Sequence, residues 1–330
     1  MGDVAMTVPV LRIFSQTYPG VKITVLSRPF FKPLFEGIPN LDFLEADVKG
    51  RHKRFGIIKL ANEAKDLEID AVADLHNVIR SKIITKYLHL KGVKTATIDK
   101  GRAEKKTLVA AKGGIISPLK TTHQRYADVF EKLGLPIDLK QHIVPPKKRL
   151  SPKLSGLLGV ENKKLIGIAP FAAHQSKMYP LGIMAEVIRD LDGSDKYRIF
   201  LFGGGKKEIE QLKKMEHPFT NVTNVAGKLT FEEELALISN LDLMLSMDSG
   251  NGHLAAMFGV PVLTLWGVTH PFAGFAPFNQ PESNRLLSDR EKFPLIPTSV
   301  YGNKFPDGYD EVMKSIAPEM VVLKIAALLK

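Results

Sequence analysis

The sequence predicts an α/β protein with parallel sheets in two domains, on three observations. Short apolar runs alternate with helical patterns along the whole chain, as they do in βαβ units. A run such as 241–246 is typical of a strand that is covered on both faces. A length of 330 residues is enough for two domains, and a turn-rich, charged segment at 145–152 separates two series of these units.

The elements follow in order within each series. In the first series, the expected strands are 21–27, 43–48, 71–76 and 93–98, and the expected helices lie near 7–18, 54–68, 78–90 and 122–134. The second series has expected strands at 165–170, 197–203, 221–225, 241–246 and 261–266, with helices at 180–191, 206–215, 230–239, 251–258 and 309–329. We therefore expect a first domain over 1–150, a second over 151–308, and a C-terminal helix over 309–330.

Composition excludes several classes of protein. The chain has no cysteine, so it forms no disulfide, zinc–thiolate site or catalytic thiol. No run approaches the roughly 18–20 apolar residues that cross a bilayer. The N-terminus lacks a charged region followed by an apolar core, so we expect no secretory signal and a cytoplasmic location.

Excess positive charge is confined to the first half of the chain. Residues 1–150 hold 27 Lys and Arg against 15 Asp and Glu, whereas residues 151–330 hold 19 against 20. A basic domain points to a polyanionic partner, which is a nucleic acid, an anionic membrane surface or a phosphorylated substrate. The alternative is a solvated basic surface without a partner.

A polar turn between two apolar runs marks the first candidate site. Asp248, Ser249 and Gly250 end the run 241–246 and open a helical pattern that contains His253. Such a turn, at the carboxyl end of a parallel strand, directs free N–H groups and the positive end of a helix dipole at a ligand. These four residues are therefore candidates for anion binding; a turn without a ligand is the alternative.

The same stretch resembles the nucleotide-sugar motif of glycosyltransferase family 9, the lipopolysaccharide heptosyltransferases. Its pattern, D-[ST]-G-x-x-H-L-A-A-x-x-G-x-P, is matched by Asp248, Ser249, Gly250, His253, Leu254, Ala255, Ala256, Gly259 and Pro261. The resemblance implies a GT-B architecture, in which two Rossmann-like, doubly wound domains flank a cleft. It also implies an acceptor site on the first domain, a donor site on the second, and a C-terminal helix that packs back on the first.

Asp3 matches the family's proposed general base. Family members open with a strand and the pattern I-x-R-x-S-S-x-G-D-V, of which Gly2, Asp3 and Val4 correspond to the end. A carboxylate in a cleft can deprotonate an acceptor hydroxyl, although Asp also favours helix N-caps. The strand that precedes this pattern in the family is central in its sheet. We therefore expect either a start of the gene further upstream, or open strand edges that are compensated in another way.

A second family segment surrounds Lys177. The family pattern P-G-A-x-x-x-S-K-x-W-P is matched by Pro170, Ala172, Ser176, Lys177 and Pro180, and it departs at the Gly position and at Tyr179, where the family has Trp. The resemblance implies that the Lys177 ammonium neutralises the diphosphate leaving group and that Ser176 adds a hydroxyl donor.

Two further turns and one D-x-D sequence give weaker indications of a binding site. Gly204 and Gly205 form a glycine-rich turn that either lets a nucleotide approach the backbone or is a plain turn. Thr230 is expected to cap a helix, with Glu233 completing a capping box. The one D-x-D sequence, at Asp190, is expected to be a solvated loop, and we expect no metal site and no cofactor.

Together these features predict an inverting, metal-independent glycosyltransferase. Asp3 and Lys177 are the expected catalytic residues, and the expected donor-binding residues are Ser176, Gly204, Gly205, Asp248, Ser249, Gly250 and His253. The resemblance implies ADP-heptose as the donor and an anionic glycolipid, such as lipopolysaccharide core, as the acceptor. The basic first half agrees with peripheral contact at the inner face of the cytoplasmic membrane. The alternatives are a nucleotide-sugar-binding homologue with impaired catalysis and a nucleic-acid-binding α/β protein.

Overall fold

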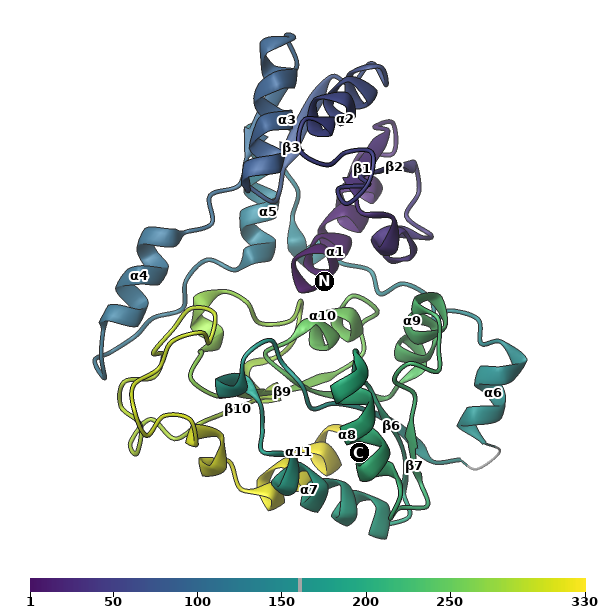
Figure 1. Ribbon diagram of the computed structural model, residues 1–330, viewed down its shortest axis with the longest axis vertical. Coiled ribbons are helices and arrows are strands. Elements are labelled where there is room, and N and C mark those ends of the chain that lie inside the picture. Colours follow the sequence, from purple (N-terminus) through teal and green to yellow (C-terminus); the bar gives the residue numbers. More distant parts are fainter. Residues whose placement is uncertain (160–161) are drawn as a thin grey trace. The chain divides into compact units, whose positions relative to one another are not determined.

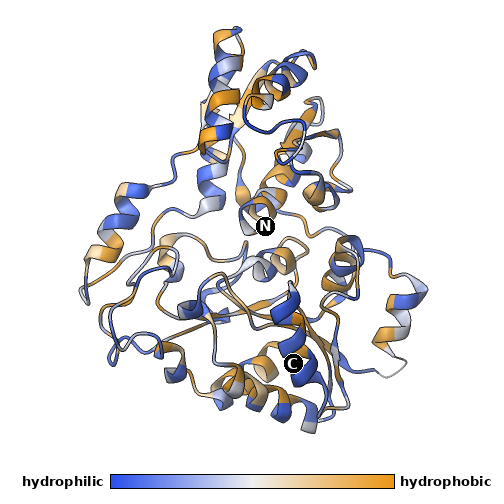
Figure 2. Cartoon of the chain, in the orientation of Figure 1, coloured by the Kyte–Doolittle hydropathy of each residue, from blue (hydrophilic) through white to orange (hydrophobic). Residues whose placement is uncertain are grey.

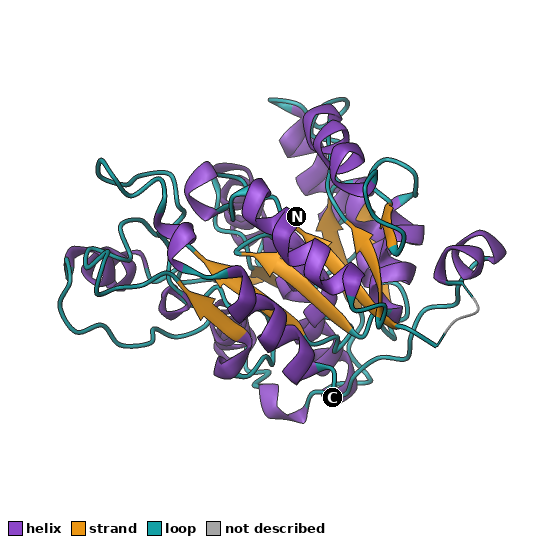
Figure 3. Ribbon diagram, turned by 90° about the horizontal axis from the view of Figure 1, so that it is seen from below, coloured by secondary structure: helices purple, strands orange, loops and turns teal. Residues whose placement is uncertain are grey.

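A six-stranded parallel sheet forms the centre of the second half of the chain, and Figures 1 and 3 show its strands side by side. The structure is a computed structural model that describes residues 1–159 and 162–330. It divides into a first unit, Asp3–Arg102 with Lys120–Ile143, and a second unit, Ala103–Leu119 with Val144–Lys330. Each unit is described by itself.

The strand order in the second unit is β10-β9-β8-β5-β6-β7. Its strands are β5 (Lys164–Ala169), β6 (Tyr197–Leu201), β7 (Val222–Asn224), β8 (Leu243–Met247), β9 (Val262–Trp266) and β10 (Arg285–Leu287). Every residue of β8 and β9 is buried. Because successive side chains of a strand point to opposite faces, this sheet is covered on both sides, as the apolar runs predict.

Helices connect these strands in the manner of a doubly wound fold. The connecting helices are α7 (Leu181–Gly193), α8 (Lys206–Glu216), α9 (Phe231–Asn240) and α10 (Gly250–Ala256). Helices α4 (Arg102–Ala110) and α6 (Pro152–Leu158) precede the sheet in the chain, and α11 (Pro318–Leu328) follows it. Helix α7 buries Met184, Val187, Ile188 and Leu191, which recur at helical spacing. Thr230 caps α9 and forms the expected capping box with Glu233.

The first unit contains four strands in two separate pairs. They are β1 (Ile23–Ser27), β2 (Leu41–Glu45), β3 (Ala71–Asp74) and β4 (Lys94–Thr97), and the helices are α1 (Gly2–Thr17), α2 (Gly56–Lys65), α3 (Ile79–Leu90) and α5 (Thr122–Lys132). Among the described residues, β1 pairs with β2 alone and β3 with β4 alone. Each strand of the two pairs therefore has one edge that pairs with no other described strand.

Several boundaries differ from the prediction. The first helix begins at Gly2 instead of residue 7, and α4, α6 and β10 had not been predicted. The predicted continuous helix over 309–329 is wrong, because the chain forms a short 3₁₀ helix, Val312–Ser315, and then α11. Ala317 is extended (φ −68°, ψ 140°), as expected for a residue before proline, and it separates the two helices.

The C-terminal helix packs within the second unit. Val321 and Ile325 of α11 belong to the core beside β5 and β8, and α11 contacts α7. Across the described ranges 1–159 and 162–330, no helix combines the length and the hydropathy that crossing a bilayer requires.

Candidate functional site

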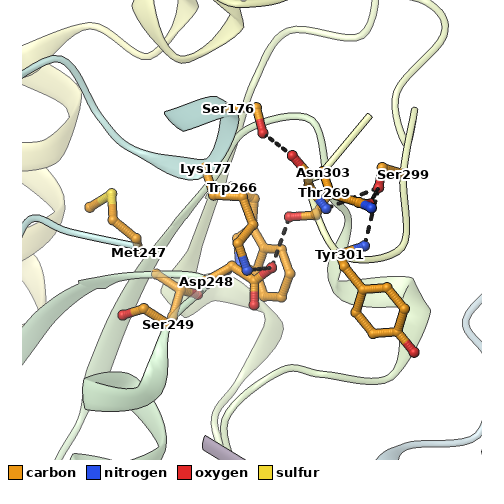
Figure 4. A network of polar contacts seen from close by, with 12 residues as sticks. Ser176, Lys177, Met247, Asp248, Ser249, Trp266, Thr269, Ser299, Tyr301 and Asn303 are labelled. Atoms are coloured by element: carbon orange, nitrogen blue, oxygen red, sulfur yellow. Dashed lines mark hydrogen bonds and ion pairs between the residues drawn. The ribbon is translucent and has the colours of Figure 1, made fainter. Parts of the chain in front are cut away.

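Lys177 and Asp248 form a buried ion pair where the strand order of the second unit reverses (Figure 4). From β5 the chain continues to β6 and β7 on one side and then to β8 on the other. Lys177 follows β5, and Asp248 directly follows β8. Their Nζ and Oδ2 atoms are 3.1 Å apart, and their side chains are 11% and 10% exposed. Open α/β sheets bind ligands at the carboxyl ends of their strands, at such a reversal.

A third strand contributes a hydroxyl to this pair. Thr269 follows β9, and its Oγ1 donates to Oδ2 of Asp248 at 3.0 Å. Asp248 therefore has a cation and a hydroxyl donor, which offset the cost of burying its charge. An ammonium has three N–H donors, and the bond to Asp248 uses one. The arrangement thus presents a fixed positive charge at the carboxyl edge of the sheet.

A loop far along the chain holds the segment that carries Lys177 (Figure 4). Buried Ser176 donates its hydroxyl to the backbone oxygen of Gly302. Ser299 accepts from the N–H of Tyr301 at 3.3 Å and of Gly302 at 3.0 Å, and it bonds Asn303 Oδ1 at 2.9 Å. These bonds fix the loop against residues 176–177.

Gly302 allows this loop to approach Lys177 closely. Its φ is +83°, and a Cβ atom at this position would lie 2.6 Å from Cγ of Lys177. Only glycine combines that backbone conformation with that contact. The methylene chain of Lys177 is therefore fixed by packing, and its ammonium by Asp248.

Ser249, Gly250 and His253 lie at the start of α10, next to Asp248. Ser249 precedes the helix, and its hydroxyl lies 3.1 Å from that of Ser246 instead of capping α10. The first turn of α10, which begins at Gly250, therefore has no side-chain cap. Its backbone N–H groups follow Asp248 closely in the sequence. His253 is buried at 7% exposure within the helix. Donor binding by these three residues stays a prediction.

Gly204 and Gly205 lie one strand further along the sheet, between β6 and α8. Gly205 has a φ of +80°, which explains a glycine at this position without a ligand. Gly204 donates its N–H to Oε2 of Glu208 at 2.8 Å, so the turn is satisfied by its own helix. Side chains added at either glycine would meet no atom within 4 Å, and this open space is compatible with nucleotide approach.

Asp3 belongs to the first unit, where it lies exposed in the first turn of α1. Tyr126 donates its hydroxyl to the backbone oxygen of Asp3 at 3.2 Å. Burial lowers the pKa of His76, and Lys100 lowers it further, whereas the Asp3 carboxylate opposes both effects. Burial likewise lowers the pKa of Lys100, again opposed by Asp3. Asp3 therefore lies among basic groups from the ends of β3 and β4.

Sequence reasoning missed several of these residues. Thr269 and Lys100 follow the expected strands 261–266 and 93–98, and His76 ends the expected strand 71–76, so the rule that identified Asp248 could have found them. Ser299 and Gly302 follow no such pattern. Tyr179, which stands where the family pattern has Trp, has a role in packing. It is fully buried and donates its hydroxyl to the backbone oxygen of Ile316 at 2.6 Å.

Comparisons with known proteins identify relatives of this chain by sequence. The model of glycosyltransferase family 9 (heptosyltransferase) matches residues 57–295. Lipopolysaccharide core heptosyltransferase OpsX of Haemophilus influenzae is 26% identical over 288 residues, which cover 84% of this chain and 79% of that protein.

Two solved structures resemble the whole chain. ADP-heptose lipopolysaccharide heptosyltransferase II of E. coli has a TM-score of 0.69 and 19% identity, and the match covers 99% of this chain and 95% of that one. A family 9 glycosyltransferase from Veillonella parvula has a TM-score of 0.74 and 20% identity, over 99% and 94% of the two chains. These likenesses confirm the predicted GT-B architecture.

Proposed function

Since this chain belongs to glycosyltransferase family 9 (heptosyltransferase), we propose that it transfers a heptose from ADP-heptose to lipopolysaccharide core or a similar anionic glycolipid. The acceptor class is supported by the relative in Haemophilus influenzae, which is a lipopolysaccharide core heptosyltransferase. The donor is supported by the E. coli structure, whose protein is an ADP-heptose heptosyltransferase.

The observation that carries the proposal is the buried Lys177–Asp248 pair at the strand reversal. A departing diphosphate needs positive charge that is already in place when the bond breaks. Lys177 meets this need because Asp248 and the 299–303 loop hold its side chain. Ser249, Gly250 and Ser176 are the proposed hydroxyl and N–H donors beside it, and His253, Gly204 and Gly205 complete the proposed donor site.

The proposed reaction is a single displacement with inversion at the anomeric carbon. The Asp3 carboxylate takes the proton from an acceptor hydroxyl, and the hydroxyl oxygen attacks the anomeric carbon. The bond from that carbon to the diphosphate oxygen breaks, and ADP leaves with the electron pair. Lys177 balances the charge that develops on ADP. This assignment requires no metal ion, so the rate is expected to be unchanged by a chelator.

The charge distribution supports a location at the inner face of the cytoplasmic membrane. The excess positive charge lies in residues 1–150, in the half to which the acceptor is assigned. An anionic glycolipid in a membrane surface has the complementary charge, and such attachment weakens as salt is added. Nothing in the site favours the alternatives of impaired catalysis or nucleic-acid binding.

The test is a calorimetric titration of the full chain with ADP, GDP, UDP and NAD, followed by a transfer assay with ADP-heptose. We expect selective binding of ADP that weakens in Lys177→Ala and Asp248→Ala. Lys164→Ala is the matched control, because Lys164 is a 54% exposed partner of Asp242 at the other end of β5. Equal binding of all four nucleotides would contradict the donor assignment. Selective ADP binding without transfer would support the impaired homologue instead.

A further inference from the structure

Helix α3 in the first unit has two apolar stripes on opposite sides. Ile84 and Leu88 are buried and pack in a core cluster with Leu60 of α2. Ile79, Ile83 and Leu90 are 79%, 38% and 74% exposed. At 3.6 residues per turn these three fall within about 40° of one another around the helix. The core accounts for the first stripe and leaves the second unexplained.

The exposed stripe is flanked by positive charge alone. Residues 75–98 contain five Lys and Arg and no Asp or Glu, and all five basic side chains are exposed. Lys82 and Lys86 border the stripe on one side and Arg80 on the other, by the same helical geometry. Figure 2 shows the resulting alternation of hydrophobic and hydrophilic residues along α3. Lys91 lies just beyond the helix, with its Nζ 5.7 Å from the centre of the Tyr87 ring.

This pattern matches the surface of an anionic lipid bilayer. Apolar side chains on one face of an interfacial helix enter the boundary between headgroups and acyl chains. The flanking Lys and Arg extend their charged ends to lipid phosphates while their methylene chains stay in apolar surroundings. An anionic bilayer surface thus offers acyl chains to the apolar residues of α3 and phosphates to its basic residues.

A second copy of the chain and a nucleic acid are less suitable partners for the exposed face of α3. A second copy of the chain would bring the same cations, Arg80, Lys82 and Lys86 of α3 and the adjacent Lys91, against their equivalents, and like charges repel. A nucleic acid would satisfy these cations, but it would leave Ile79, Ile83 and Leu90 without an apolar partner. Aliphatic side chains also lack the ring face on which bases stack.

We propose that α3 docks this chain on an anionic bilayer through Ile79, Ile83 and Leu90, with Arg80, Lys82 and Lys86 against lipid phosphates. The inference deepens the proposed function, on which it rests, because a glycolipid acceptor would lie in that surface. The proposal places membrane attachment on one helix, α3. The overall charge of residues 1–150 does not point to any particular helix or strand.

The first experiment measures co-sedimentation of the full chain with phosphatidylcholine vesicles, with and without phosphatidylglycerol. We expect binding to the anionic vesicles. Replacing Arg80, Lys82 and Lys86 together by Gln is expected to weaken it on the order of 100-fold, since each cation near such a surface contributes about fivefold. Replacing Ile79, Ile83 and Leu90 together by Ser is expected to weaken it comparably. Circular dichroism spectra and urea unfolding curves like those of the wild type show that both variants are folded, because ADP binding reports on the second unit alone.

The matched controls lie on the second unit. Leu323 of α11 is a 69% exposed apolar residue, and Lys213 and Lys214 of α8 are exposed cations. Leu323→Ser and the change of both lysines to Gln are expected to keep full vesicle binding. Loss of binding in these controls as well would indicate nonspecific attraction and overturn the assignment to α3.

Insertion is tested directly by fluorescence. The chain has one Trp, Trp266, which is buried at 1% exposure and gives a constant background. In Leu90→Trp the emission is expected to shift to shorter wavelength on anionic vesicles, and in Leu323→Trp it is expected to stay constant. An unchanged Leu90→Trp spectrum, or tighter α3-dependent binding to duplex DNA than to vesicles, would overturn the proposal. Failure of the wild-type chain to bind ADP would instead contradict the proposed function, whatever the vesicle result.

Discussion

Gly302 lies against the methylene chain of Lys177, so close that a Cβ atom there would be 2.6 Å from Lys177 Cγ. The two residues are far apart in sequence, and the loop that joins them in space also accepts the Ser176 hydroxyl. The position of the proposed charge at the donor site therefore depends on a residue that has no functional group of its own.

Gly302→Ala is expected to reduce kcat/KM for sugar transfer by roughly 10- to 100-fold, because displacement of a catalytic group by about 1 Å has effects of that size. Steady-state kinetics measures it. Gly308→Ala is the control, since Gly308 has a φ of +79° but open space around it. Both variants bear the same backbone strain, and equal losses would show that strain, not the contact with Lys177, is responsible.

Lys177→Met is expected to destabilise the chain by about 3–5 kcal/mol, the cost of leaving one charge of a buried pair without its partner. Urea unfolding of the single variants and of the double variant with Asp248→Asn gives the coupling energy. The exposed pair Lys164–Asp242, with atoms 3.7 Å apart, is the control and is expected to give at most about 1 kcal/mol. Similar coupling in the two pairs would contradict the burial argument.

Asp3→Asn is expected to slow transfer by about 10²–10⁴-fold, the usual contribution of a general base. ADP binding is expected to stay unchanged, because the proposed donor residues all lie in the second unit. Rapid-quench measurement of product formation separates the chemical step from donor binding. Glu131→Gln, an exposed carboxylate of the same unit, is the control. An Asp3→Asn chain with the wild-type rate would exclude Asp3 as the base.

Glu234 makes stability depend on pH. Burial raises the pKa of this carboxyl from 4.5 to about 7. The folded chain thus keeps a proton that the unfolded chain loses, and stability falls as the pH rises from 4.5 to 7, by roughly 3 kcal/mol for a difference of this size. Glu234→Gln is expected to remove that loss, so the variant gains stability over the wild type at pH 8 and little at pH 4.

Chemical denaturation at the two pH values measures this effect. Glu232→Gln is the control, because Glu232 lies in the same first turn of α9 but is exposed. A stability gain for Glu234→Gln that is equal at both pH values would show that the carboxyl is not held protonated by burial.

The longer strands of both units could be predicted from sequence, whereas α4, α6 and β10, which lie mainly in the second unit, could not. The strands of that unit are buried on both faces, so their apolar runs identify them, and the polar residues after them mark the site. This is why Lys177 and Asp248 could be selected before their distance was known. In the first unit, all five residues of β1 are half-buried and the strands form two pairs. The elements that were missed are short, and α4 buries Lys105 and Leu108 alone among its residues, so they carry little of the periodic apolar signal on which prediction depends.

The 299–303 loop could not have been predicted. Ser299 and Gly302 have no periodic pattern around them. Gly302 contacts Ser176 and Lys177, over a hundred positions earlier, and Ser299 bonds within the loop itself. Contacts of this kind are set by how the finished sheet brings distant loops together. The exposed stripe of α3 was missed for another reason, since sequence alone does not say which of two apolar stripes faces the core.

The hydrogen bond from Tyr179 to Ile316 joins the Lys177 segment to the part of the chain that leads into α11. Tyr179 lies two residues after Lys177, and Ile316 directly precedes the segment that opens α11. A deletion of residues 316–328 would thus free the Lys177 segment from one of its anchors. Such a deletion would act as a defect in donor turnover as well as in folding.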